Sequence, residues 1–526
     1  MRLREAVIAA NRFGLGARRG EIRDIASDPR GWLLGQLQPE HTLPEPMRAL
    51  PSTASDSIAY IRWAVGVGIR TAGTGDASAF DAAGDMSKPR GEEQDGIEAS
   101  FRATFEPRYE RALKARIDVA RQTSAPFFER LVHFWSNHFA ISAQKAFIAG
   151  LPPSFERDVA RRHASGSFES LLLASSKHPG MLYYLDNWIS IGPNSRWGRN
   201  HAERPTLPVI GAPKGLNENL AREILELHSI GVQGGYTQAD VTELARILTG
   251  WTVRRRAAER GTAAWSARRD QAVERLGAAT PESRARMATF VAGLMDRQAA
   301  YYDGEPLSLF AFEAHAHEPG ERSLLGRQYE DAGLLQGERA LRDIARHPAT
   351  ATFVASKLVR HFVSDSPPPP VVKRAAAAFL ASDGAVGKVM EAIIQSPETW
   401  DEHLTKFKRP EEYVISVLRA FPEIELTGAQ LRVTLEAMGQ KPYNQPAPDG
   451  WPDDATQWLG ADGLWKRIEW ALDIASHVKD VATADTLAQD LLGDQLSAAT
   501  SAALRRATDS REAVGMLLVS PEFHRR

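Results

Sequence analysis

The sequence contains no cysteine among its 526 residues. Disulfides, thiolate metal sites, iron–sulfur clusters and cysteine nucleophiles are therefore excluded. No stretch approaches the run of about 20 apolar residues that a membrane helix needs, so no integral membrane segment is expected. An excess of one charge is also lacking, because 64 basic residues stand against 66 acidic ones, for a net charge of −2. This balance provides no general attraction to nucleic acids or membrane surfaces.

Several common enzyme motifs are absent as well. The chain carries no Walker loop, no dinucleotide-binding fingerprint, no HExxH and no Gly-x-Ser-x-Gly. Arginine runs at 254–256 and 268–269 are short and interleaved with acidic residues, so no nucleic acid partner is expected. The apolar run "AVIAA" near the start is too short for a secretory signal. A cytoplasmic location is therefore expected, while periplasmic export together with a partner protein stays open.

The composition that remains is typical of a globular protein, with 43% hydrophobic and 25% charged residues. Apolar residues recur every three or four positions almost throughout the chain. This spacing predicts a mainly α fold, built as a multi-helical orthogonal array. Only the aromatic, turn-rich residues 301–330 indicate strands, as a small β-hairpin. We expect the N- and C-terminal thirds to pack on one core that also holds residues 217–251. Two His-Pro pairs, at 178–179 and 347–348, each join two helical runs.

Changes in composition divide the chain into six segments. These are an N-terminal helical segment (1–70), a flexible insertion (71–96), a helical core (97–251), a charged helical insertion (252–300), a hairpin with further core helices (301–405) and a C-terminal helical segment (406–526). The first insertion is rich in Gly, Ala, Asp and Glu and cannot bury enough apolar surface to offset an ordering entropy of about 1–2 kcal/mol per residue. We therefore expect proteolysis to begin there.

The densest polar pattern is "NENLAREILELHSIGVQGGYTQADVTELARILTGW", residues 217–251. Its apolar spacing predicts two helices joined by "GVQGG", with Thr237 and Asp240 as a capping box at the start of the second. Glu223 and Glu226 are three positions apart and share a helix face. Two carboxylates this close repel each other unless an arginine, a proton or a cation lies between them.

Two interpretations of this stretch stay open. In the structural one, Arg222 and Arg246 neutralise the carboxylates, and Asn217 and Asn219 satisfy loop backbone. In the functional one, the carboxylates converge with groups from elsewhere on a pocket, as metal ligands or acid–base catalysts. The same two arginines and two asparagines are then candidates for binding a substrate or an anion.

The catalytic candidates come from three segments. Glu223 and Glu226 would act with His138 of "FWSNHFAIS" and His317 of "AHAHEPGERSLLG", although each lone histidine is more often structural. Glu226 and His228 lie about 200° apart around a helix, so one ion cannot take both. The metal therefore stays unknown, with a divalent metal ion as the expected cofactor if there is one.

Three further residues are candidates for binding a substrate or an anion. Asn137 lies beside His138, and Lys357 and Arg360 belong to "KLVRHF". The alternative for the two cations is simple pairing with carboxylates.

These motifs, in this order, resemble the bacterial family called domain of unknown function 1800. The resemblance spans nearly the whole chain and rests on "NRFGLGA", "HFWSNHFAIS", "HPGMLYYLDN", the run 217–251, "KRPEEYVISVLRA", "GQKPYNQPAPDGWP" and "SPEFHRR". Glu318 and Arg322 stand where the family usually has Asp and Lys, and Arg is not a neutral replacement for Lys.

The resemblance implies a helical fold and does not by itself supply an activity. Many relatives are encoded beside sulfatase-like proteins of a second uncharacterised family, which implies a sulfatase-like partner protein. Two functions therefore stay open. The first is a hydrolase-like enzyme, with or without a metal, that uses a polar Glu/His/Asn/Arg pocket. The second is a non-catalytic assembly or maturation partner of the sulfatase-like protein.

Overall fold

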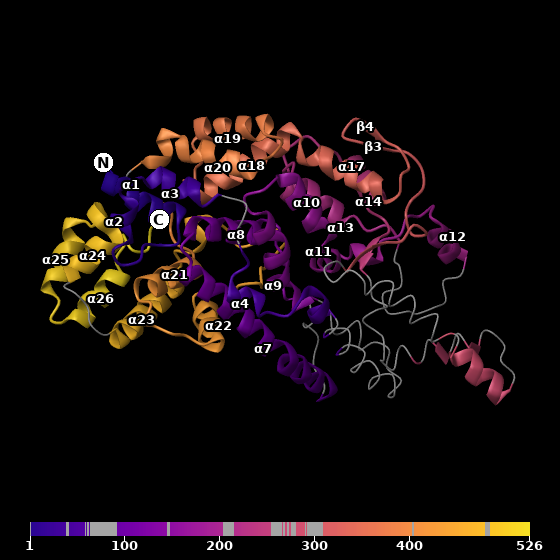
Figure 1. Ribbon diagram of the computed structural model, residues 1–526, viewed down its shortest axis with the longest axis horizontal. Coiled ribbons are helices and arrows are strands. Elements are labelled where there is room, and N and C mark those ends of the chain that lie inside the picture. Colours follow the sequence, from indigo (N-terminus) through magenta and orange to yellow (C-terminus); the bar gives the residue numbers. More distant parts are fainter. Residues whose placement is uncertain are drawn as a thin grey trace.

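The computed structural model describes residues 2–37, 42–57, 92–144, 148–203, 215–253, 309–401, 404–478 and 484–526, with positions 59 and 63 and short pieces between 266 and 291. Helices dominate and point in many directions, as Figure 1 shows, so the predicted mainly α fold is confirmed. Within the described part of the chain, no helix is both long and apolar enough to cross a membrane.

The helices run in this order: α1 Arg2–Ile8, α2 Glu21–Ile25, α3 Pro29–Gly35, α4 Glu45–Arg48, α7 Glu92–Gln122, α8 Pro126–His138, α9 Leu151–Phe155, the π-helical η3 Glu156–Arg161, α10 Phe168–Lys177, α11 Pro179–Tyr184, α12 Arg196–Glu203, α13 Asn219–Glu223, the π-helical η5 Ile224–His228, α14 Gln238–Ile247, α17 Leu334–Ala345, α18 Pro348–Phe362, α19 Pro369–Ala381, α20 Val386–Gln395, α21 Pro410–Ala420, α22 Gly428–Ala437, α23 Ala461–His477, α24 Ala484–Leu492, α25 Ala498–Arg506 and α26 Ser510–Leu518.

Histidine begins two of these helices. His178 precedes α11 and His347 precedes α18, each with a proline at the first helical position. In both cases the imidazole Nδ1 accepts a hydrogen bond from the amide two residues later, at 3.1 Å from Gly180 and 3.2 Å from Ala349. The imidazole thus replaces the serine or threonine side chain that usually caps a helix. The repeated His-Pro motif is therefore a local helix cap.

Two short antiparallel strand pairs interrupt the helices. Strands β3 Arg322–Leu324 and β4 Arg327–Tyr329 form the predicted hairpin, joined by a turn with positive φ at both of its residues. Strand β1 Trp251–Val253 pairs with β2 Phe310–Phe312. The sequence did not predict this second pair, because β1 is three residues long and carries no alternating pattern of its own.

The interior contains two main hydrophobic clusters. The first joins α1–α3, α8–α11, the helices of 217–251 and α17–α20. The second joins α21–α26 with part of α7 and Leu15. Figure 1 places α24 beside α2 at one end of the molecule, with α25 and α26 next to α24. The expected single core is therefore wrong for the C-terminal helices. Apolar spacing shows that a helix packs, but it does not show against which partner.

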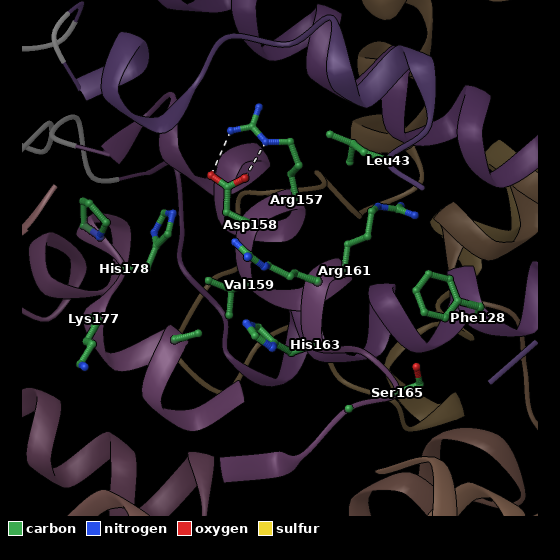
Figure 2. Close-up of a pocket in the computed structure, with 14 residues that line it drawn as sticks. Leu43, Phe128, Arg157, Asp158, Val159, Arg161, His163, Ser165, Lys177 and His178 are labelled. Atoms are coloured by element: carbon green, nitrogen blue, oxygen red, sulfur yellow. Dashed lines mark hydrogen bonds and ion pairs between the residues drawn. The ribbon is translucent and has the colours of Figure 1, made fainter. Parts of the chain in front are cut away.

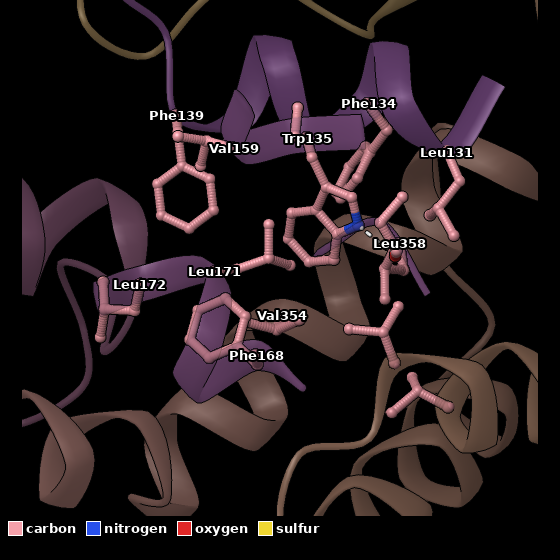
Figure 3. Close-up of a cluster of buried hydrophobic side chains, with 14 of the residues drawn as sticks. Leu131, Phe134, Trp135, Phe139, Val159, Phe168, Leu171, Leu172, Val354 and Leu358 are labelled. Carbon is pink, nitrogen blue, oxygen red and sulfur yellow. Dashed lines mark hydrogen bonds between the residues drawn. The ribbon is translucent and has the colours of Figure 1, made fainter. Parts of the chain in front are cut away.

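Aromatic residues of α8 occupy the centre of the first cluster (Figure 3). Trp135 is fully buried, and its indole Nε1 donates to the carbonyl of Ala164 at 2.9 Å. Phe168 of α10 packs against it in a tilted arrangement, with ring centroids 5.9 Å apart and ring planes at 46°. Satisfying the single indole donor lets this large ring be buried at little polar cost. The cluster fixes the end of α8, where two of the candidate residues lie.

Two of the predicted segments lie largely outside the described residues. Positions 71–91 of the first insertion and most of 254–300 in the second belong to this group. Helix α7 begins at Glu92, four residues before the predicted end of the first insertion at 96.

Candidate functional site

The stretch 217–251 forms the two predicted helices. Leu220 and Ile224 of the first and Val241 and Leu244 of the second are fully buried. The predicted capping box is present, since Thr237 Oγ1 accepts from the Asp240 amide at 3.2 Å and Asp240 Oδ2 accepts from the Thr237 amide at 2.8 Å. The apolar faces are therefore turned to the core, and the carboxylates lie at its margin.

The first of these helices widens into a π-helical turn at η5. There the Ser229 hydroxyl donates to the carbonyl of Ile224, and the Gly231 amide donates to the carbonyl of Leu225 at 2.9 Å. In a π-turn the backbone hydrogen bonds depart from regular α-helical geometry, and such turns are frequent at functional sites. Here the wider turn changes the directions in which the side chains of Glu226 and His228 point relative to that of Glu223.

Arg222 and the two asparagines have local partners. Arg222 contacts Glu226 at 3.2 Å and Glu218 at 3.3 Å, all on a partly exposed helix face. Asn217 Oδ1 accepts from the Asn219 amide at 2.8 Å, which is a turn that begins α13. The contacts of Arg222 and Asn217 agree with the structural interpretation, whereas Asn219 takes part through its backbone amide.

A second polar group surrounds the turn between α14 and β1. His317 Nδ1 donates to the carbonyl of Thr249 at 3.0 Å, and the Glu318 amide donates to Thr249 Oγ1 at 2.8 Å. The buried Glu318 carboxylate accepts from the backbone and side-chain amides of Asn194 at 2.8 and 2.7 Å. Both residues therefore hold the 192–195 loop against this turn.

The arginines of this second group are also engaged. Arg246 pairs with Glu243 on the same helix. Arg322 lies 3.6 Å from Glu243 and 3.8 Å from Glu318. Arg322 thus connects α14 to the hairpin.

Glu223 stands apart from these paired carboxylates. Its Oε2 is buried and has no hydrogen-bond partner among the residues that the structure describes. Burial, with the negative charges of Glu226 and Asp449, raises the pKa of Glu223 to about 7, although Arg222 opposes this shift. The carboxyl group is therefore close to half ionised at neutral pH.

Tyr184 and Asp449 complete the surroundings of Glu223. Burial, followed by the charges of Glu223 and Asp449, raises the pKa of Tyr184 to about 12. The phenol therefore keeps its proton across the physiological range. Tyr184 ends α11, whereas Asp449 lies in the loop before α23 and is exposed. We call Glu223, Glu226, Tyr184 and Asp449 the Glu223 cluster.

Asn137 fixes the loop that carries Asp449. Its Nδ2 donates to the carbonyl of Trp451 and its Oδ1 accepts from the Trp451 amide, both at 2.8 Å. Gly450 has a φ of 83°, and a Cβ there would lie 2.4 Å from the Asn137 carbonyl oxygen. Only glycine allows this close approach of loop and helix.

His138 and His228 lie together behind this loop contact. His138 Nε2 donates to the carbonyl of His228 at 3.0 Å, and the two rings are 6.3 Å apart. Burial, followed by the charge of Lys357, lowers the pKa of His138 to well below its usual value and that of His228 to about 3. Both imidazoles are therefore neutral at pH 7.

Lys357 of α18 lies among these groups. Its ammonium is 6.0 Å from the centre of the Phe353 ring, and burial lowers its pKa, a shift that the charges of Asp453 and Asp449 oppose. Arg360, one helical turn further on, is exposed. Lys357 thus joins the electrostatic surroundings of the site, while Arg360 lies at its edge.

Three of the segments that carry predicted site residues therefore meet, namely the end of α8, the helix of Glu223 and α18, and the 449–453 loop joins them. The sequence missed Tyr184, Asp449 and the buried pair His361–Asp453, in which Nδ1 and Oδ1 are 2.8 Å apart. Their motifs, "HPGMLYYLDN" and "GQKPYNQPAPDGWPDD", were visible but have no local pattern that indicates proximity. His317 belongs to the second polar group instead.

Within the described ranges, no group of three or more histidine, aspartate or glutamate side chains is arranged to hold a metal ion. The two carboxylates of 217–251 do not share a histidine, since His228 lies on the buried side and Glu226 on the partly exposed side. The described residues thus offer no complete ligand set for the divalent metal ion that the sequence left open as a cofactor.

Residues 8–525 match the family described as a protein of unknown function (DUF1800). The chain belongs to the DUF1800 family. No curated protein and no solved structure matches the chain. The family model covers nearly the whole length of this DUF1800 protein, but it describes no activity. The chemistry of the protein therefore depends on its own site residues.

Proposed function

We propose that this DUF1800 protein is a hydrolase-like enzyme whose general acid–base residue is Glu223. The observation that carries this proposal is the buried Glu223 Oε2, which lacks a hydrogen-bond partner among the described residues, beside Tyr184 and two other acidic groups. A paired structural carboxylate would have its oxygens satisfied. A carboxyl group that exchanges its proton near neutrality suits general acid–base catalysis.

In the proposed reaction, the ionised Glu223 takes a proton from a water molecule as that water attacks an electrophilic carbon, phosphorus or sulfur atom. The protonated Glu223 then returns the proton to the leaving oxygen or nitrogen. Tyr184 remains a neutral hydrogen-bond donor beside it, and Lys357 supplies positive charge in the same region. A fixed donor and a nearby cation stabilise negative charge that develops in such a transition state.

The remaining predicted residues take other roles in this proposal. Glu226 raises the proton affinity of Glu223 by its charge. His138 positions the η5 turn through its hydrogen bond to the carbonyl of His228. Because its pKa is lowered, its imidazole is neutral at pH 7 and has no proton to give as a general acid. Asn137 positions the loop of Asp449. A metal-dependent variant of the mechanism would need ligands from beyond these residues.

The test is a hydrolysis screen with chromogenic esters, phosphate esters, sulfate esters and glycosides, with and without EDTA. Glu223→Gln should lower kcat/KM for any substrate found by about 100-fold or more, as general acid–base catalysts typically contribute that much. Glu243→Gln is the matched control, because it lies in the same stretch and pairs with Arg246. Equal activity of Glu223→Gln and the wild type would refute the proposal.

One observation favours the second candidate function, a role as assembly or maturation partner of a sulfatase-like protein. Trp465 and Leu472 of α23 are 57% and 53% exposed, seven positions apart and therefore on one helix face. Two large exposed apolar side chains on one helix face can form part of a protein contact surface. Trp465→Glu should abolish co-elution with a purified sulfatase-like partner and leave hydrolysis unchanged. An unchanged complex would count against this role.

A further inference from the structure

A cavity of about 530 Å³ opens beside the π-helical turn η3 and the junction of α10 with α11 (Figure 2). Its volume falls in the range of small-molecule sites. None of its lining residues belongs to the Glu223 cluster. The cavity is therefore a second candidate site with its own chemistry.

Basic side chains predominate in the walls of this cavity. Four of them are lysine or arginine, and Asp158 is the single carboxylate among the lining residues. Arg157 binds Asp158 through two hydrogen bonds, at 2.7 and 3.0 Å, and the Thr53 hydroxyl donates to it at 2.6 Å. Figure 2 shows this pair at one side of the cavity. The one acidic group is thus already occupied and leaves little capacity to accept a further hydrogen bond.

Part of the positive charge is not neutralised. Arg161 pairs with the buried Glu129, and Lys177 pairs with Glu338. Arg162 also lines the cavity, is exposed, and has no ion pair with a residue that the structure describes. The balance of these pairs leaves one full positive charge, that of Arg162, at the cavity.

Two buried donors in the same walls also lack acceptors. His178 Nδ1 accepts from the Gly180 amide at 3.1 Å, so in the neutral ring the proton is on Nε2. That Nε2 is buried and has no partner among the described residues, and the same is true of Arg161 Nε. Burial lowers the pKa of His178 to about 4, so its ring is neutral at pH 7. Unsatisfied buried donors are costly, and a ligand that brings acceptors would relieve the cost.

Apart from His163, Ser165 and Gly166, the rest of the lining is apolar. Leu43, Phe128, Val159, Ala174 and Pro179 contribute side chains to the cavity. A ligand that fills the volume therefore needs a hydrocarbon or ring portion as well as acceptor atoms.

We propose that this cavity binds a small organic anion, in which a carboxylate or phosphate group meets Arg162 and the free donors, and an apolar body meets Phe128. The proposal does not depend on the function proposed for Glu223, since the two sites share no residue. Carboxylate and phosphate have the same acceptor chemistry, and the binding experiment distinguishes them.

The experiment is isothermal titration of the full chain with phenyl phosphate, benzoate, inorganic phosphate and benzyl alcohol. Phenyl phosphate or benzoate should bind at least tenfold more tightly than both inorganic phosphate, which lacks the apolar body, and benzyl alcohol, which lacks the charge. The tighter of the two aromatic anions identifies the acidic group. Binding of benzyl alcohol as tight as that of the anions, or no binding of any anion, would overturn the proposal.

Two variants localise the binding. Arg162→Gln should weaken it at least tenfold, while Arg505→Gln, which makes the same charge change on an exposed end of α25, should leave it unchanged. His178→Asn keeps a side chain that can cap α11 and removes the Nε2 donor, so it should also weaken binding. Equal weakening by Arg505→Gln, or none by Arg162→Gln, would show that the anion binds elsewhere.

Discussion

Asn137 binds the backbone of Trp451 in both directions, donating from Nδ2 and accepting at Oδ1 with both distances at 2.8 Å. The two residues are 314 positions apart in the sequence. This pair of hydrogen bonds holds the 449–453 loop against the end of α8. The loop carries two carboxylates of the site, Asp449 near Glu223 and Asp453 on His361.

Asn137→Ala should destabilise the protein by about 1–3 kcal/mol, because two backbone groups of Trp451 lose their partners. Asn137→Asp keeps the acceptor and should cost less than the alanine variant. Gly450→Ala should be at least as harmful as Asn137→Ala, since its Cβ would meet the Asn137 carbonyl oxygen. Urea unfolding of the three variants provides the measurement. A Gly450→Ala protein as stable as the wild type would contradict the close approach.

The sequence predicted what is encoded locally. The two helices of 217–251 and the capping box at Thr237 follow from periodicity and from one pair of spaced residues, and both are confirmed. The hairpin near 322–329 has its own turn signal and is also confirmed. In each case the information lies within about ten residues, the range over which helix, cap and turn propensities act.

The site could be predicted only in part, because contact across the chain has no local signal. Asp449 is more than 200 positions from Glu223, and nothing in "PAPDGWPDD" indicates that neighbour. The sequence did mark Asn137, His138 and Lys357 as candidates, and the structure places them in the same region. It also grouped His317 with them, whereas His317 bonds to the turn at Thr249.

Glu412 provides a test of acid stability. Burial alone would raise its pKa, but Arg526, Arg409 and Arg130 outweigh that effect and hold the pKa well below the usual range. Arg130 lies 2.8 Å and Arg526 3.0 Å from the carboxylate. Because the folded pKa is depressed, this stabilisation is complete above the unfolded pKa of about 4.3 and is lost as the pH falls below it.

Glu412→Gln should therefore destabilise the protein by about 3–5 kcal/mol at pH 7, because buried guanidinium groups lose their counter-charge. Below pH 4 the difference from the wild type should shrink. The control is Glu391→Gln, an exposed residue whose pair with Lys388 at 2.8 Å should be worth at most about 0.5 kcal/mol. Urea unfolding at pH 7 and pH 3.5 gives both values. If Glu412→Gln loses no more stability at pH 7 than the control does, the stabilising role of Glu412 among these arginines is refuted.

His228 should make the fold sensitive to mild acid. Its pKa is lowered to about 3 by burial and by Lys357, against about 6.5 in the unfolded chain. The unfolded chain therefore takes up a proton first, and stability falls as the pH drops from 6.5, by up to about 1.4 kcal/mol per pH unit for one group. His228→Gln should lower stability at pH 7.5 and reduce this slope.

The control for His228→Gln is His477→Gln on the exposed face of α23, which should leave the slope unchanged. Free energies of unfolding at pH 7.5, 6 and 5 decide the matter. Parallel curves for His228→Gln and the wild type would mean that His228 does not resist protonation in the folded protein.

Glu223 should behave in the opposite way to Glu412. Its pKa is raised to about 7 by burial, Glu226 and Asp449, against about 4.3 in the unfolded chain. The folded protein therefore holds the proton more tightly, so its ionisation removes stability as the pH rises from about 4.3 through 7. A carboxylate that is a structural ion-pair partner would instead add stability over that range.

Glu223→Gln should consequently unfold at the same temperature as the wild type at pH 5 and at a higher one at pH 8.5. We expect a gain of about 1 kcal/mol at the higher pH, because partial exposure screens the repulsion. Glu243→Gln, which gives up a pair with Arg246, should show no such gain. Glu226→Gln and Asp449→Asn each remove one repelling charge, so each should lower the pKa of Glu223 and move the acidic limb of any pH–rate profile to lower pH. Two results together would contradict this role: a Glu223→Gln protein that is less stable than the wild type at pH 8.5, and a pH–rate profile whose acidic limb is the same in Glu226→Gln and Asp449→Asn as in the wild type. Glu223 would then be a structural residue, and the basis for acid–base chemistry at this site would be removed.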